Sequence, residues 1–179
     1  MTAELRGYFA IGAEGINKSQ NVGALMRTAH AFGASFVFTV AETYSVRRGN
    51  LSDTSKTSNS LPLYSFDSIE NMNLPEKCQL VGIELTEDAI NLPSFKHPLQ
   101  AAYILGPEQG SLSPEMLEKC DHIIKIPTKF CINVSVAGAL VMYDRVTSLG
   151  KYPNRPIMAG GGIPEIDNHH FAIAKCKRK

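Results

Sequence analysis

The sequence predicts one α/β domain built on a parallel β-sheet. Two observations support this class: apolar runs rich in β-branched and aromatic residues alternate with stretches of helical periodicity, and these runs lack apolar/polar alternation. Strands without such alternation are typical of a sheet that helices cover on both faces. The length of 179 residues suits a single domain, which we assign to residues 1–150.

The first part of the chain is predicted to form a strand, a helix and a second strand. Tyr8–Ile11 is short and apolar, and Phe36–Val40 is rich in aromatic and β-branched residues. Between them a helix is expected, with Asn21 as its N-cap and Gly33 as its C′ residue. The apolar stripe of this helix comprises Val22, Leu25, Met26, Ala29 and Phe32.

The alternation continues in the second half of the chain. Ser113 and Pro114 have the residue types of an N-cap and a first helical position, so a helix is expected to begin there. Leu112 and Leu117 stand where a hydrophobic staple would place them. Three further strands are predicted at Leu80–Leu85, Ala101–Leu105 and His122–Ile126.

The last helix is predicted to begin near Asn133 and to stop at Gly150. Its expected buried face comprises Val134, Ala137, Leu140 and Val141. Residues 151–179 are rich in Pro and Gly and then become basic, so we assign them to an irregular C-terminal extension.

Composition limits the function without naming it. No apolar run approaches the roughly 18 residues of a membrane helix, and the first ten residues lack the features of a secretion signal. We therefore expect a cytoplasmic protein without a membrane partner. The net charge of +1 does not mark a nucleic-acid binder. Arg47-Arg48 and the C-terminal KCKRK are candidate phosphate contacts, with a solvated loop and tail as the equally weighted alternative.

No metal site is predicted. The four cysteines, at positions 78, 120, 131 and 176, form no CxxC pair and are expected to be reduced thiols. His169-His170 and Cys176 match no usual zinc spacing.

Three segments carry polar residues at places where α/β proteins bind ligands. In the first, Arg27 shares a helix face with Gly23, although an isolated arginine on a helix is more often a surface ion pair. In the second, Glu108 follows a strand at a glycine-containing turn, which alone would be an ordinary connection. In the third, Asn133 and Ser135 stand at a helix start, where their side chains cap the helix or face a ligand, and for Asn133 capping coexists with a functional role.

Taken together and in this order, the three segments resemble the motifs of the SpoU (TrmH-type) branch of the SPOUT RNA methyltransferases. The resemblance extends from about Gly15 to Arg145. It implies a parallel-sheet fold with a C-terminal trefoil knot, a homodimer, and S-adenosylmethionine as cofactor. The implied reaction is methylation of a ribose 2′-hydroxyl of tRNA or rRNA. A knot is a rare exception in protein topology, and periodicity alone does not predict one.

The resemblance also implies roles for individual residues. Arg27 would grip a phosphate and polarise the 2′-hydroxyl, because a protonated guanidinium is a poor base. The other catalytic positions it implies are Asn21, Glu108, Asn133 and Ser135. The implied cofactor-binding positions are Ile83, Glu84, Gly106, Ile126, Ile132 and Ala137.

Two departures from the family pattern leave an alternative open. Gln109 and Ser111 replace glycines of the second motif, and Cys131 stands where a serine is common in the third. A thiol is a weaker hydrogen-bond donor than a hydroxyl. The alternative function is therefore a non-catalytic RNA-binding knot protein. A dehydrogenase-like nucleotide binder is disfavoured, because the chain lacks an early glycine fingerprint.

Overall fold

The computed structural model describes residues 7–42, 61–150 and 152. In chain order, the described elements are β1 (Tyr8–Glu14), α1 (Ser19–Phe32), β2 (Phe36–Val40), β3 (Leu63–Phe66), β4 (Gln79–Ile83), β5 (Ile90–Asn91), the 3-10 turn η2 (Leu92–Ser94), β6 (Gln100–Leu105), α2 (Pro114–Lys119), β7 (His122–Lys125) and α3 (Val134–Leu149). Arg47, Arg48, His169, His170 and Cys176 lie outside these ranges, as does nearly all of the predicted extension.

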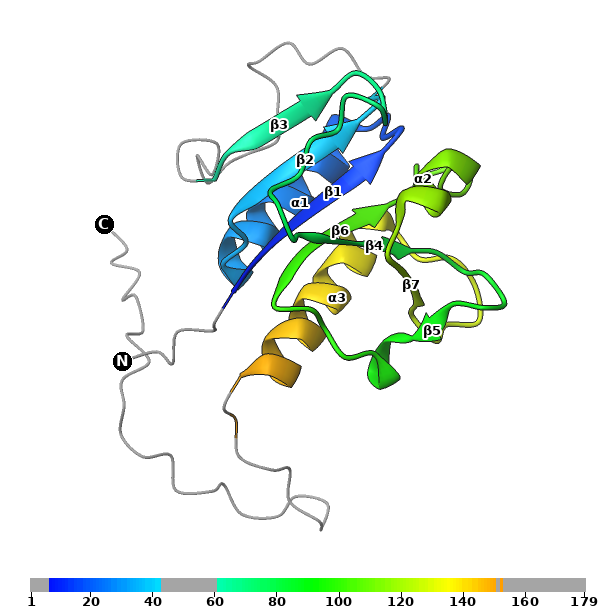
Figure 1. Ribbon diagram of the computed structural model, residues 1–179. Coiled ribbons are helices and arrows are strands. Elements are labelled where there is room, and N and C mark those ends of the chain that lie inside the picture. The colour runs from blue at the N-terminus through cyan, green and yellow to red at the C-terminus, as the bar shows by residue number, and fades with distance from the viewer. Residues whose placement is uncertain (1–6, 43–60, 151, 153–179) are drawn as a thin grey trace, which may run out of the picture.

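The strands form one parallel sheet in the order β3-β2-β1-β6-β4-β7-β5 (Figure 1). All carboxyl ends of the strands therefore lie along the same edge of the sheet. The predicted α/β class with a parallel sheet is confirmed.

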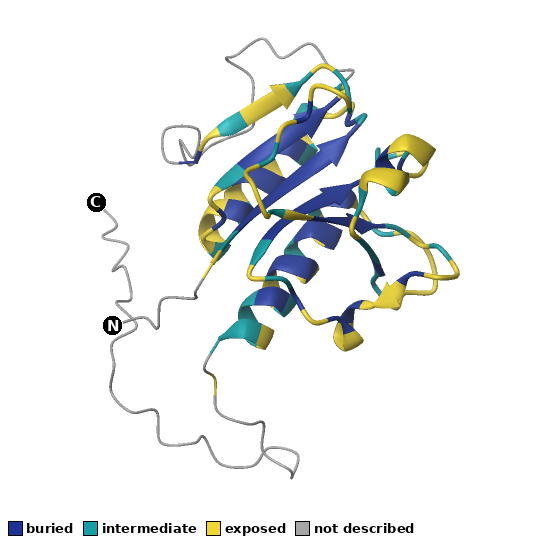
Figure 2. Cartoon of the chain, viewed as in Figure 1, coloured by how far each residue is buried: buried dark blue, intermediate teal, exposed yellow. Residues whose placement is uncertain are grey.

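Helices cover the two faces unequally. α1 and α3 pack side by side on one face, where alternate residues of the central strands such as Ile11 and Tyr103 point. The opposite face, with Phe38 and Ile104, is covered by α2 and by the connection before β4. Figure 2 shows the buried residues running along the central strands and the inner sides of α1 and α3.

The chain changes face between β1 and β6, which are neighbours in the sheet. The helix after β1 lies on one face, whereas the helix after β6 lies on the other. In open α/β sheets, a crevice forms outside the carboxyl ends of two strands whose connections diverge in this way. The topology therefore predicts a binding crevice beside the carboxyl end of β6, near Leu105.

Several predicted boundaries are correct. Phe36–Val40 is β2 without any change, and α3 begins directly after Asn133, whose side chain accepts a hydrogen bond from the Ser135 amide. Ser113 caps α2 by accepting a hydrogen bond from the Met116 amide. Gly33 ends α1 with a φ of 76°, a left-handed conformation that glycine adopts without strain.

Other predictions need correction. Asn21 is not the N-cap of α1, because the amides of Asn21 and Val22 already donate to the Lys18 carbonyl and the helix begins one turn earlier. Leu140 is 41% exposed, since it lies on the side of α3 that faces away from the sheet. The strand predicted at Leu80–Leu85 ends at Ile83. The short strands β3 and β5 were not predicted.

Within the described ranges, no helix is both long and apolar enough to cross a membrane. Cys78, Cys120 and Cys131 are free thiols.

Candidate functional site

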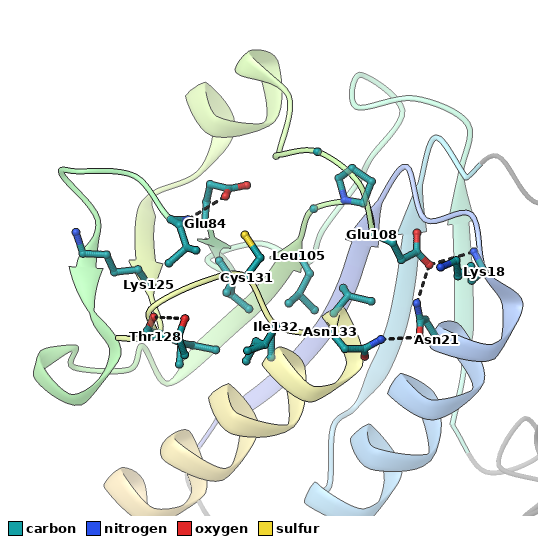
Figure 3. Close-up of a pocket in the computed structure, with 18 residues that line it drawn as sticks. Lys18, Asn21, Glu84, Leu105, Glu108, Lys125, Thr128, Cys131, Ile132 and Asn133 are labelled. Carbon is teal, nitrogen blue, oxygen red and sulfur yellow. Dashed lines mark hydrogen bonds between the residues drawn. The ribbon is translucent and has the colours of Figure 1, made fainter.

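A cavity of about 300 Å³ lies at the carboxyl ends of β4, β6 and β7 (Figure 3). Its size falls at the lower end of the range of ordinary small-molecule pockets. The connections after these strands form most of its wall, and the first turns of α1 and α3 complete it. The lining residues are Lys18, Asn21, Ile83, Glu84, Leu85, Leu105, Gly106, Pro107, Glu108, Gly110, Lys125, Ile126, Thr128, Cys131, Ile132, Asn133, Val134 and Ala137.

One part of the cavity wall is largely apolar and carries a single carboxylate. Glu84 accepts hydrogen bonds from the amides of Leu85 at 2.9 Å and Leu112 at 2.8 Å, so it ties the end of β4 to the turn after β6. All six positions predicted to bind the cofactor line this cavity, namely Ile83, Glu84, Gly106, Ile126, Ile132 and Ala137.

The turn at Gly106 requires a residue without a side chain. A Cβ atom there would lie 3.0 Å from the Leu112 nitrogen and 3.2 Å from the Ser111 carbonyl carbon. Both atoms belong to the backbone, so they can move away only if the turn changes shape. Glycine therefore keeps the turn tight and leaves the peptide groups of this wall open to the cavity.

A chain of hydrogen bonds crosses the other part of the cavity. Glu108 accepts from the amide of Asn17 at 3.0 Å, the amide of Lys18 at 3.1 Å and the side-chain amide of Asn21 at 2.9 Å. The Asn21 carbonyl oxygen in turn accepts from the Asn133 side chain at 3.2 Å. Figure 3 shows these side chains gathered between the starts of α1 and α3.

The chain of hydrogen bonds ends at the first turn of α3. The Asn133 carbonyl oxygen accepts from the Ser135 amide at 2.9 Å and from the Ser135 hydroxyl at 2.6 Å. Asn133 thus caps its helix with one end of its amide and contacts Asn21 with the other. Capping and site formation are therefore combined in Asn133, as the sequence predicts for this residue.

The environment of Glu108 keeps it ionised. Burial by itself would raise the pKa of this carboxyl, but hydrogen bonds from Asn17, Asn21 and Lys18 favour the charged form and bring the pKa below its usual value. A carboxylate with this pKa is a weak base at neutral pH. Glu108 is therefore suited to holding Asn21 in one orientation.

Arg27 and Ser135 are placed differently from the other predicted catalytic residues. Arg27 is exposed on α1 and does not line the cavity, because it lies nearly two turns beyond Asn21 and on a different side of the helix. Ser135 also does not line the cavity, and it reaches it through Asn133.

Sequence reasoning missed several residues that build this site. Lys18 and Lys125 line the cavity, and the sequence predicted no role for either. Buried Glu14 accepts from the Ser113 amide at 2.9 Å and the Ser113 hydroxyl at 2.6 Å, and so joins the end of β1 to the start of α2. The sequence offered one signal for Glu14, which is that a charged residue directly follows an apolar run. A charged residue at the end of a buried strand indicates a specific hydrogen-bonding partner.

Comparison with known proteins identifies the family. The model of the SpoU rRNA Methylase family matches residues 8–143, which contain the whole sheet and the cavity. This chain belongs to the SpoU family. The resemblance seen in the three sequence segments is thereby confirmed.

Relatives within the SpoU family differ greatly in length. The chain is 28% identical over 138 residues to the mouse tRNA (guanosine(18)-2′-O)-methyltransferase TARBP1. The matched region covers 72% of this chain and 9% of TARBP1. This chain also superposes with a TM-score of 0.70 on the SpoU methyltransferase AviRb from Streptomyces viridochromogenes in complex with AdoMet. The two sequences are 19% identical, and the superposition covers 79% of this chain and 58% of the AviRb chain.

A third relative has nearly the same length as the matched region. Its structure was described as giving insights into the 2-OH methylation of C/U34 on tRNA. It superposes on this chain with a TM-score of 0.70 at 20% identity, covering 80% of this chain and 91% of the relative. At these identities, the two structural similarities establish the SpoU fold. The chain spans less than two thirds of the TARBP1 and AviRb chains, so their activities are not transferred by similarity alone.

Proposed function

We propose that this protein uses S-adenosylmethionine to methylate a ribose 2′-hydroxyl of tRNA or rRNA. One observation carries the proposal. Asn21, Glu108 and Asn133, which come from three distant segments, form a single hydrogen-bonded chain beside an apolar cavity at the carboxyl edge of the sheet. The names of the related proteins support the same reaction.

The cavity fits the cofactor that the family implies. Its apolar wall at Ile83, Ile126 and Ile132 suits an adenine ring, and the tight turn at Gly106 lies at the cavity wall, where its backbone can offer hydrogen-bonding groups. Glu84 supplies acceptors to hydroxyl groups or to a positive charge. When bound there, the cofactor would supply an electrophilic methyl group.

The residues of the hydrogen-bonded chain would position the RNA for this reaction. Methyl transfer to a hydroxyl needs in-line alignment of the oxygen and removal of its proton. Asn21 and Asn133 carry both donors and acceptors, and Glu108 fixes the orientation of Asn21. These amides can therefore hold a ribose in place.

We also propose that two copies of the chain complete the site. Val136, Leu140 and Tyr143 lie on the side of α3 that faces away from the sheet and are 50%, 41% and 53% exposed. An exposed apolar stripe of this kind is typical of a protein interface. Within one copy, Arg27 does not line the cavity. A partner packed on this helix layer would bring its own Arg27 toward it. The trefoil knot remains a prediction of the family resemblance.

The reaction is tested by mapping ribose methylation in RNA from cells with and without the gene. Loss of a 2′-O-methyl group at one site would support the proposal and identify the RNA. Calorimetry with S-adenosylmethionine tests the cofactor separately. RNA binding without S-adenosylmethionine binding would instead favour the non-catalytic RNA-binding protein.

The role of Arg27 and the dimer are tested together. Arg27→Ala should abolish turnover and leave the affinity for S-adenosylmethionine nearly unchanged, because Arg27 is assigned to the phosphate and the 2′-hydroxyl of the RNA rather than to the cofactor. Mixing inactive Arg27→Ala with inactive Asn133→Ala should restore part of the activity, since a mixed dimer contains one intact site. A fully active Arg27→Ala protein, or a monomer in light scattering, would contradict the proposal.

A further inference from the structure

Two lysines line the cavity, and they are engaged in different ways. The Lys125 ammonium donates to the carbonyls of Thr86 and Glu87, both at 2.9 Å, and so joins the end of β7 to the connection after β4. Within the part of the chain that the structure describes, the Lys18 ammonium makes neither a hydrogen bond nor a salt bridge. Both ammonium groups are charged, but Lys125 is held by two carbonyls, whereas all three N–H groups of Lys18 are available to a ligand.

The backbone of Lys18 is held firmly although its side chain is exposed. Its amide donates to Glu108 at 3.1 Å, and its carbonyl accepts from the Asn21 amide at 3.0 Å. Lys18 thus forms the junction between the second segment of the site and the start of α1. Because the backbone at Lys18 is already fixed, binding a ligand orders only the side chain and costs no further backbone entropy.

The position of Lys18 indicates which reactant it meets. Figure 3 shows Lys18 beside Glu108 and Asn21, on the opposite side of the cavity from Glu84, Lys125 and Thr128. The apolar wall with Glu84 is where the cofactor fits, whereas the hydrogen-bonding side chains at Asn21 and Asn133 suit the ribose. Lys18 therefore lies on the side where RNA would enter.

Electrostatics favour a phosphate over the cofactor as the ligand of Lys18. The cofactor carries a positive sulfonium, which a nearby ammonium would repel. The phosphate attached to a ribose lies close to its 2′-hydroxyl and carries a full negative charge, which Lys binds as a compact point charge. In the part of the chain that the structure describes, the Lys18 ammonium forms no salt bridge with Glu108, although the Lys18 backbone amide donates to that carboxylate.

From these observations we propose that the Lys18 ammonium binds a backbone phosphate of the RNA next to the ribose that is methylated. The proposal rests on the proposed function and adds a contact on the substrate side of the same site. The carboxylate of the cofactor is the competing anion, and the experiment distinguishes the two.

The test uses Lys18→Met and Lys18→Arg, with Lys96→Met as the matched control. Lys96 is also exposed and lies before β6, at the opposite edge of the sheet from the cavity. The probe is a labelled pool of tRNA from cells that lack the gene, and its dissociation constant is measured across a series of salt concentrations. The affinity for S-adenosylmethionine is measured by calorimetry on the same proteins.

Lys18→Met should weaken tRNA binding by about tenfold at low salt and reduce the slope of log affinity against log salt by about 1, since one phosphate contact is lost. Lys18→Arg should restore most of the affinity and slope. The Lys96→Met control should match the wild type. S-adenosylmethionine affinity should change less than twofold in all three variants.

Two results would overturn the proposal. One is wild-type tRNA affinity and salt slope in Lys18→Met, and the other is weaker S-adenosylmethionine binding with unchanged tRNA binding, which would assign Lys18 to the cofactor carboxylate. Failure of the proposed function looks different. A wild-type protein that binds tRNA with a Lys18-dependent slope, but transfers no methyl group to it, would refute the enzyme and leave the phosphate contact intact.

Discussion

Among individual residues, Glu108 shows how hydrogen bonding selects the role of a carboxylate. Its two oxygens receive three N–H donors, two of them from the backbone at the start of α1. These bonds lower the pKa of Glu108 despite its partial burial. The same bonds leave little capacity for accepting a proton from substrate, so we assign Glu108 to positioning.

Replacing Glu108 with Gln should reduce kcat by roughly 10²-fold, because Asn21 is no longer held and misplaced groups slow a reaction that depends on alignment. The Gln amide also places an NH2 group against donors that need an acceptor. S-adenosylmethionine affinity should change little. The measurement is kcat from pH 6 to 9 for the wild type, Glu108→Gln and the exposed control Glu76→Gln.

The pH profile separates positioning from base catalysis at Glu108. A carboxyl with a lowered pKa stays ionised throughout this range. The wild type and Glu108→Gln should therefore show the same dependence of kcat on pH, apart from its overall level. An ionisation that is present in the wild type and disappears in Glu108→Gln would show that Glu108 removes the proton. The Glu76→Gln control should keep the wild-type rate.

Among the elements, α2 has six residues and owes its position to side chains at its first turn. Ser113 caps it, and the Ser113 hydroxyl donates at 2.6 Å to Glu14, which is buried at the end of β1. Leu112 and Met116 pack into the core beside this cap. The cap therefore links the helix, the first strand and the turn that forms the cavity wall.

Ser113→Ala should lower the free energy of unfolding by about 1 to 2 kcal/mol, because the N-cap is lost and buried Glu14 loses a donor. Ser111→Ala is the matched control, since Ser111 is an exposed residue of the same turn. Urea unfolding of both variants measures the effect. Equal stability of the two variants would show that Ser113 does not anchor α2.

Elements with a local signal were predictable from the sequence, and elements without one were not. The cap at Asn133 and the glycine after α1 act within a few residues of their own helix. β3 and β5 have four and two residues and little burial, so they lack an apolar run. The orientation of Asn21 depends on Glu108, which is 87 positions away. Asn21 precedes the apolar stripe, as an N-cap residue would, and only its contact with Glu108 shows where its side chain points.

Across the whole molecule, the amino ends of the strands hold a second polar cluster, opposite the cavity. The buried Arg145 guanidinium donates to the carbonyls of Pro98 at 2.6 Å and Leu99 at 2.9 Å, and to the Tyr103 hydroxyl at 3.1 Å. Buried His97 contacts the Tyr103 hydroxyl at 2.6 Å and Asp144 at 2.9 Å. This cluster fixes the C-terminal half of α3 on the sheet, while Asn133 fixes its start at the site.

The charge state of His97 should couple this cluster to pH. Burial lowers the pKa of His97 from the ordinary value of 6.5, and it outweighs the hydrogen bond to Asp144, which acts in the opposite direction. The nearby Arg145 charge also disfavours a second cation. Burial raises the pKa of Tyr103 to about 12, so its hydroxyl stays protonated at any pH of interest.

The free energy of unfolding should therefore fall as the pH drops below about 6.5. In this range an unfolded His97 gains a proton, whereas the folded ring stays neutral until the pH reaches its lowered pKa, so protons stabilise the unfolded chain. Urea unfolding at pH 7.5 and 5.5 measures the loss.

His97→Gln should lower stability at pH 7.5, because packing and hydrogen bonds change, and yet show a smaller further loss at pH 5.5. His30→Gln, in an exposed position on α1, serves as the control and should keep the wild-type loss. If His97→Gln loses as much stability as the wild type between the two pH values, His97 does not take up the proton that this account assigns to it.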